Sequence, residues 1–205
     1  VLTNLKKAQK RWHEDSDIHA FSLTATTGAG KTVMAAAVFE ALFYGDDDYD
    51  FEPDHGAAVI WFSDDPSLNE QSKYRLMEAS DKLTMSDLVT VENTFCREKF
   101  ESGKVYFLNT QKLSKKSLLV RGHDTEDPTI ETDSGQIRLM PDDRAYTIWD
   151  TILNTIEDPE LTLYLVLDEA HRGMKQDRGH KTIVSQLING NGGVPGIPVV
   201  LGISA

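Results

Sequence analysis

The chain has 205 residues, of which 40% are hydrophobic and 26% are charged, and its formal net charge is −12 at pH 7. These values exclude a disordered chain and a fibre, and the length suits one domain with a full core. The apolar runs fall short of the roughly 20 residues that cross a membrane, and the start lacks the apolar core of a signal peptide. The single cysteine, Cys96, excludes an internal disulfide. We therefore expect one folded domain over residues 1–205, in the cytoplasm.

The acidic balance bears on nucleic-acid binding without deciding it. An evenly acidic surface would disfavour binding, because contacts to phosphates need local Lys or Arg. A protein can also contact a nucleic-acid backbone through hydroxyls, amides and helix N-termini within an acidic surface. The net charge therefore leaves this class of function open.

Strand and helix patterns alternate along the chain. The predicted strands cover residues 20–25, 57–62, 88–91, 105–108 and 161–167. The predicted helices cover residues 4–13, 33–43, 68–79, 95–100 and 146–156. The repeated order of strand and helix predicts an α/β fold with a parallel sheet.

Residues 121–143 interrupt this alternation. They are rich in Asp, Glu, Thr, Gly and Pro, with Pro128 and Pro141 as breakers. Within them, residues 129–132 and 136–139 flank a short Asp-Ser-Gly turn, which is the pattern of a small hairpin. We therefore expect a surface insertion here.

The first predicted strand leads into a small-residue loop, Ala-Thr-Thr-Gly-Ala-Gly-Lys-Thr, at residues 25–32. The spacing is that of a phosphate-binding loop, except that Ala25 stands where the usual pattern has glycine. Glycines let the backbone turn tightly, and the helix that follows points its positive dipole end at the same place. The residues expected to bind a nucleotide are Thr27, Gly28, Ala29, Gly30, Lys31 and Thr32.

Two side chains of this loop have distinct expected roles. The Lys31 ammonium would reach the β- and γ-phosphates of ATP, and the Thr32 hydroxyl would ligate the Mg²⁺ that bridges them. Gln9, in the first predicted helix, either contacts the nucleotide base from outside the loop or is a solvated side chain. The sequence therefore predicts ATP and Mg²⁺ as cofactors.

A second group of polar residues, Asp168 to His171, directly follows the strongly apolar strand at 161–167. Carboxylates at the C-terminal end of a buried parallel strand lie where α/β sheets bind ligands. Asp168 would hold the Mg²⁺, and Glu169 would orient and polarise the attacking water. His171 either relays the state of the γ-phosphate to another segment or closes the turn. This arrangement favours hydrolysis of ATP by water.

Together these segments resemble the superfamily 2 helicases of the DEAD/DEAH-box type, and most closely the helicase domain of type III restriction enzyme Res subunits. Residues 27–32 resemble helicase motif I, and residues 168–171 are motif II letter for letter. Residues 67–72 resemble motif Ia and residues 107–111 resemble motif Ib of the Res branch. Residues 202–205 resemble the strand that leads into motif III.

The resemblance implies a RecA-like P-loop NTPase fold, α/β, with a mostly parallel central sheet and helices on both faces. It implies an ATPase that moves along duplex DNA or separates its strands, with Ser204 coupling hydrolysis to movement. We expect the strand that ends at Ser204 to lie beside the phosphate-loop strand, so that the Ser204 hydroxyl approaches motif II. Motifs Ia and Ib would contact the DNA backbone, or their polar residues would instead cap helices and turns. These residues are Ser67, Asn69, Gln71, Thr110 and Gln111.

In such helicases a second RecA-like domain closes over the ATP and brings arginine fingers, which raise the rate by roughly 10³–10⁵. We therefore expect this chain to be the first motor domain of a larger protein and weakly active alone. Its expected partners are DNA, the second domain and a modification or specificity subunit. Two other functions stay open: an ATP-switched clamp that holds DNA without unwinding it, and a P-loop kinase for a small molecule.

Overall fold

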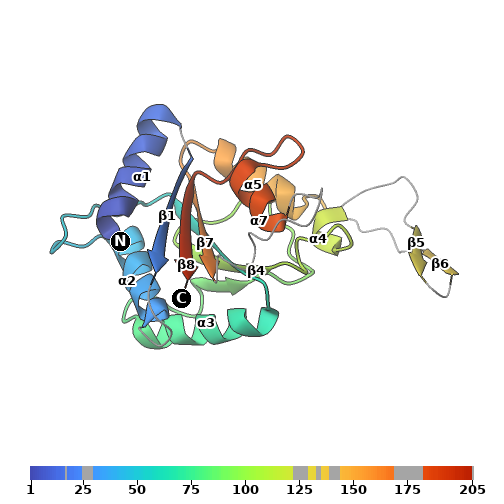
Figure 1. The fold of residues 1–205 in the computed structure, drawn as a ribbon, viewed down its shortest axis with the longest axis horizontal. Helices are drawn as coiled ribbons and strands as arrows, with labels where there is room; N and C mark the ends of the chain where they lie inside the picture. Colours follow the sequence, from blue (N-terminus) through green and yellow to red (C-terminus); the bar gives the residue numbers. More distant parts are fainter. Residues whose placement is uncertain are drawn as a thin grey trace.

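A sheet of six parallel strands forms the centre of the protein (Figure 1). The structure is a computed structural model that describes residues 1–16, 18–24, 30–121, 129–132, 135–138, 144–168 and 182–204. The strand order is β1-β8-β7-β2-β4-β3, so the predicted parallel α/β sheet is confirmed. The strands are β1 (His19–Thr24), β2 (Ala57–Ser63), β3 (Leu88–Thr90), β4 (Lys104–Asn109), β7 (Thr162–Asp168) and β8 (Val199–Ser204).

Helices cover both faces of this sheet. The described helices are α1 (Leu2–Asp15), α2 (Lys31–Tyr44), α3 (Pro66–Ala79), α4 (Leu118–Arg121), α5 (Ile148–Glu157) and α7 (Ile183–Asn189). In Figure 1, α1 and α2 lie on one side of β1 and β8, and α5 and α7 lie on the other. Among the described residues, no helix is both long and apolar enough to cross a membrane.

The two faces of the sheet carry separate apolar layers. Val59 of β2 packs in the layer that contains Phe39 of α2, whereas its neighbour Ile60 packs in the layer that contains Ile152 of α5. Successive side chains of a strand point to opposite faces, so a strand covered on both faces must be apolar at every position. This explains why β2 is a continuous apolar run that is buried throughout.

The helix predicted over residues 95–100 is wrong, since this segment contains no helical turn. Its backbone groups are bonded by side chains of α5 instead of by one another, which removes the need for helical bonds. The Thr151 hydroxyl donates to the Arg97 carbonyl (2.6 Å), the Asn154 amide donates to the Glu98 carbonyl (3.1 Å), and the Phe100 N–H donates to the Thr155 hydroxyl (2.9 Å).

The predicted hairpin in the excursion is confirmed. Strands β5 (Thr129–Thr132) and β6 (Gly135–Arg138) pair antiparallel in a two-stranded sheet separate from the main one. Figure 1 draws this hairpin beyond α4, away from the six-stranded sheet. The other residues of the excursion from 122 to 143 lie outside the described part of the chain.

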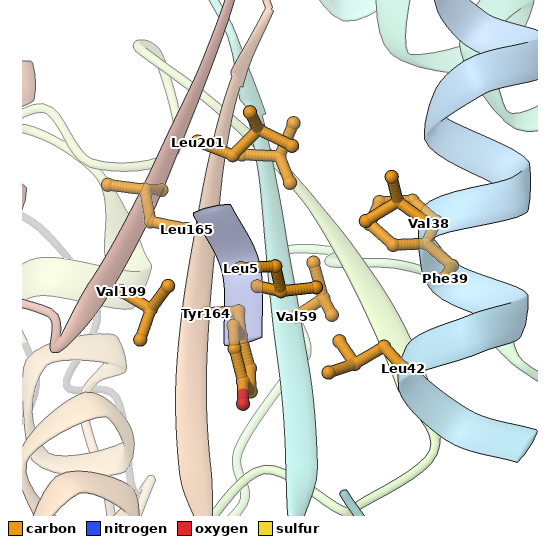
Figure 2. Close-up of a pocket in the computed structure, with 10 residues that line it drawn as sticks. Leu5, Val38, Phe39, Leu42, Val59, Tyr164, Leu165, Val199 and Leu201 are labelled. Atoms are coloured by element: carbon orange, nitrogen blue, oxygen red, sulfur yellow. The ribbon is translucent and has the colours of Figure 1, made fainter. Parts of the chain in front are cut away.

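A small apolar cavity of about 10 Å³ lies between α1, α2 and the sheet. Figure 2 shows Leu5 of α1 together with Phe39 and Leu42 of α2 around it, facing strand residues such as Val59 and Leu201. A cavity of this size is at the lower limit for one water molecule, and water needs polar partners that this lining largely lacks. The cavity is therefore a gap in packing rather than a ligand site.

Replacing Leu42 by Ala is expected to enlarge this cavity and to lower the free energy of unfolding by about 2–5 kcal/mol. Leu42 is 1% exposed and lines the cavity, so the lost methyl groups cannot be replaced by solvent. Chemical denaturation followed by circular dichroism measures the change. The matched control is Val33→Ala in the same helix, where the side chain is 55% exposed and the expected change is within about 0.5 kcal/mol.

Candidate nucleotide-binding site

The carboxyl ends of β1, β8 and β7 meet at one edge of the sheet. Thr24 at the end of β1 pairs with Ser204 of β8, and Asp168 at the end of β7 pairs with Ile203. Neighbouring strands are about 4.8 Å apart, so the backbones at Thr24 and Asp168 are about 10 Å apart across β8. The expected position of the Ser204 strand beside the phosphate-loop strand is therefore confirmed.

The Ser204 side chain and the Asp168 side chain lie on opposite faces of the sheet. Ser204 points to the same face as Val200, because the two are an even number of residues apart on β8, and Val200 packs in the α5 layer. By the same rule Asp168 points to the face of Val166, which packs in the α2 layer. Alternation along a strand therefore points the Ser204 hydroxyl away from the Asp168 carboxylate. His171, its other expected neighbour, lies outside the described residues, and the coupling role of Ser204 stays a prediction.

The start of α2 has the geometry that an anion-binding helix end requires. Gly30 is the N-cap, with φ +76° in the left-handed region, which favours glycine. The first helical bond runs from the Met34 N–H to the Gly30 carbonyl, and no side chain caps the helix. The N–H groups of the first turn, including that of Thr32, therefore point out of the helix end. Thr27, Gly28 and Ala29 lie outside the described residues.

Lys31 and Thr32 begin α2, and both are half-buried. Because Asp168 lies on the face of the sheet that α2 covers, its carboxylate and these two side chains share one side of the carboxyl edge. Glu169, the predicted partner of the attacking water, lies outside the described residues. The structure thus brings the described parts of motifs I and II to the same region.

The donor atoms of this region suit Mg²⁺. A carboxylate from Asp168 and a hydroxyl from Thr32 are the oxygen ligands that Mg²⁺ prefers. Over the described ranges, no group of three or more His, Cys, Asp or Glu could hold a metal ion by itself. A metal here would depend on the phosphates of the nucleotide for most of its ligands, which is the usual mode for Mg²⁺.

Gln9 lies far from this edge. Its amide donates a 2.9 Å hydrogen bond to the hydroxyl of Tyr164, which in turn donates a 2.6 Å bond to the Asp54 carboxylate. Burial and the nearby charge of Asp54 raise the Tyr164 pKa well above its usual value. Tyr164 is four residues from Asp168 along β7, about 13 Å of strand. This position gives no support to a contact with the nucleotide base, and it also shows that Gln9 is not a freely solvated side chain.

Helix α3 begins at the same edge of the sheet. Asp65 is its N-cap and accepts 2.8 Å bonds from the N–H and the hydroxyl of Ser67, which lower the pKa of Asp65. Ser67 and Gln71 are both exposed. The Ser67 hydroxyl therefore completes a helix cap, and both side chains remain accessible for the predicted contact with DNA.

Asn69 has a different environment, because it is 3% exposed. Its amide nitrogen donates a 2.9 Å bond to the Leu108 carbonyl, and its amide oxygen accepts a 2.8 Å bond from the Ser63 hydroxyl. The side chain thus joins α3 to the ends of β2 and β4. We expected Asn69 either to contact the DNA backbone or to cap a helix or turn. The structure favours the second role, since Asn69 holds the turns together.

Thr110 and Gln111 follow β4, which is the strand next to β2 at the same edge of the sheet. The Thr110 hydroxyl donates a 2.9 Å bond to the carboxylate of Asp64, which follows β2, and Gln111 is exposed. The exposed Lys115 and Lys116 come shortly after them in the chain. The predicted DNA-contact residues therefore follow β2 and β4, and β2 is the direct neighbour of β7, which ends in the described part of motif II.

Sequence reasoning gave no role to Ser72, which the structure places in the site. Its hydroxyl donates a 3.3 Å bond to Oδ2 of Asp168. The available signal was helical spacing, since Ser72 lies three residues after Asn69 and four before Leu76, on one buried stripe of α3. The partner could not be predicted, because it depends on which strand lies under the helix.

The six-stranded parallel sheet with its helices defines an α/β protein with a RecA-like P-loop architecture, and the start of α2 and the end of β7 form its candidate nucleotide site. The family model described as the type III restriction enzyme, res subunit, matches residues 1–205, and the chain belongs to this family. The family comprises helicase-like ATP-binding motor domains and implies hydrolase activity of that general type. A search of curated proteins found no significant match.

Asn69→Ala is expected to lower the free energy of unfolding by about 1–3 kcal/mol, because it leaves the Leu108 carbonyl and the Ser63 hydroxyl without this buried partner. Chemical denaturation measures the loss. Gln71→Ala, on the exposed side of the same helix, is the control and should change stability by less than about 0.5 kcal/mol. An Asn69→Ala variant with full stability and reduced DNA affinity would instead establish a direct DNA contact.

Proposed function

We propose that this chain is the ATP-binding motor domain of a DNA helicase or translocase of a type III restriction-like system. The observation that supports it best is the common edge of the sheet. The start of α2 and Asp168 lie there on one face, and the exposed polar residues of α3 and of the β4 end lie next to them. An ATP site and a DNA-contact surface would thus lie along the same edge of the sheet.

Within this proposal each residue of the nucleotide site has one task. Lys31 neutralises charge on the β- and γ-phosphates, and the N–H groups of the first turn of α2 bind phosphate oxygens. Thr32 and Asp168 would hold the Mg²⁺, and the ion would supply positive charge that offsets the negative charge of the phosphates. Glu169 orients the attacking water, and His171 relays the state of the γ-phosphate.

The proposed DNA contacts come from Ser67, Gln71, Thr110 and Gln111. Hydroxyl and amide groups at helix starts and turns bind phosphate oxygens without reading the bases. The exposed Lys115 and Lys116 would supply local positive charge within an acidic chain. We further propose that a second RecA-like domain supplies an arginine finger, so that rapid hydrolysis requires both domains, and that a modification or specificity subunit is a further partner.

Lys31→Ala is expected to abolish detectable ATP binding at concentrations that saturate the unaltered chain, while the fold is retained. The ammonium contributes to phosphate binding, whereas a half-exposed cation contributes little to stability. Isothermal calorimetry with Mg²⁺ and a non-hydrolysable ATP analogue measures binding. Lys7→Ala on the exposed surface of α1 is the control. Unchanged nucleotide affinity in Lys31→Ala would remove the basis of the proposal.

Glu169→Gln is expected to leave ATP binding intact and to remove DNA-stimulated hydrolysis in a protein that contains both RecA-like domains. The amide cannot polarise the attacking water, although it is nearly the same size as the carboxylate. Phosphate release with and without duplex DNA measures this, and displacement of a labelled strand tests unwinding. ATP-dependent DNA affinity without displacement or movement would indicate a clamp, and phosphate transfer to a small molecule would indicate a kinase.

A further inference from the structure

Helix α3 is connected to the proposed metal ligand by a hydrogen bond. The Ser72 hydroxyl donates to Oδ2 of Asp168 over 3.3 Å, between residues 96 positions apart in the sequence. Ser72 is 7% exposed, and Asp168 is half-buried. The bond is therefore largely shielded from water. In such an environment a hydrogen bond to a charged group is stronger than at the surface.

The position of Ser72 within α3 makes this bond significant. The helix buries a stripe composed of Asn69, Ser72 and Leu76 against the rest of the protein. Leu76 belongs to the apolar core, and Asn69 is bonded to β2 and β4. A hydroxyl at the remaining position of the stripe is costly to bury unless it has a partner. The Asp168 carboxylate is that partner.

The carboxylate lies on the face of the sheet that α2 and α3 share. Tyr164 and Val166 of β7 pack in the layer containing α2, and Asp168 continues the same alternation. Helices α2 and α3 pack against each other on that face. The carboxylate thus lies on the α2 face at the carboxyl edge of the sheet, with Ser72 donating to it from α3.

A hydrogen-bond partner can hold a carboxylate at the end of a strand in one orientation. The terminal torsion of an Asp side chain is broad, because rotation about its last bond has weak preferences. A hydrogen bond to one oxygen narrows that rotation and directs the carboxylate. In metal sites, groups that orient a ligand in this way affect metal affinity by about 10–100-fold.

We propose that Ser72 is a positioning residue for Mg²⁺–ATP: its hydroxyl orients the Asp168 carboxylate toward the metal that the nucleotide brings. This inference rests on the proposed function, because it requires Mg²⁺–ATP at the β1–α2 site. It assigns to α3 a part in nucleotide binding in addition to the DNA contacts proposed for its exposed residues.

The test compares Ser72→Ala and Ser72→Thr with the unaltered chain, using a fluorescent N-methylanthraniloyl ATP as the probe. Mg²⁺ is added stepwise from a solution that starts with EDTA, and the concentration for half-maximal nucleotide binding is recorded. Ser72→Ala is expected to need about 10-fold more Mg²⁺, with unchanged nucleotide affinity in EDTA. Ser72→Thr keeps the hydroxyl and is expected to restore most of the loss.

Ser80→Ala is the matched control. Ser80 ends the same helix, is 9% exposed and donates its hydroxyl to the Glu40 carboxylate of α2. The Ser80→Ala substitution therefore removes a part-buried bond between a hydroxyl and a carboxylate without touching Asp168. The Mg²⁺ requirement should not change. Thermal unfolding of each variant separates loss of stability from loss of metal affinity.

The outcomes separate this inference from the proposed function. Mg²⁺-dependent binding in the unaltered chain, with an equal Mg²⁺ requirement in Ser72→Ala, would overturn the positioning role and leave the motor assignment standing. An equal increase in Ser72→Ala and Ser80→Ala would reduce the effect to general stability and also overturn it. Failure of the unaltered chain to bind the probe at any Mg²⁺ concentration would overturn both.

Discussion

The parallel alignment of the six strands is the constraint on which this structure depends. Because all six run in the same direction, every carboxyl end lies at one edge, and each connection after a strand starts there. The start of α2 follows β1, α3 follows β2, and Asp168 ends β7. Segments separated by more than a hundred residues are thus placed beside one another. An antiparallel strand at any of these positions would have moved its polar end to the opposite edge.

Helix α3 connects the parts of this edge. Its N-cap, Asp65, follows the end of β2, its buried Asn69 holds the end of β4, and its Ser72 holds Asp168 at the end of β7. The exposed side of the same helix carries Ser67 and Gln71. A rigid helix with polar bonds on its buried side and accessible polar groups on its exposed side links two regions of the edge physically. Such a link is what coupling between ATP and DNA would require in a motor domain.

Local sequence patterns predicted most of the fold because they reflect local physics. The apolar runs of β2 and β7 predicted buried parallel strands, and the helix predicted over residues 68–79 corresponds to α3, which begins two residues earlier at Pro66. The segment at residues 95–100 was mispredicted because side chains of α5 bond its backbone, and no window of local sequence contains both partners. The same limitation applies to Asn69, whose burial follows from its place under β4 rather than from its neighbours in sequence.

The sequence by itself determined the family, the alternation of strands and helices, and the residue types that a phosphate loop and a metal-binding carboxylate need, because these depend on short-range spacing. Only the tertiary structure decided the strand order, which places β8 between β1 and β7. It also decided that Ser204 and Asp168 face opposite sides of the sheet, that Gln9 bonds to Tyr164, and that Ser72 reaches Asp168. These facts depend on which strands become neighbours, and that choice results from burying both faces of the sheet at once.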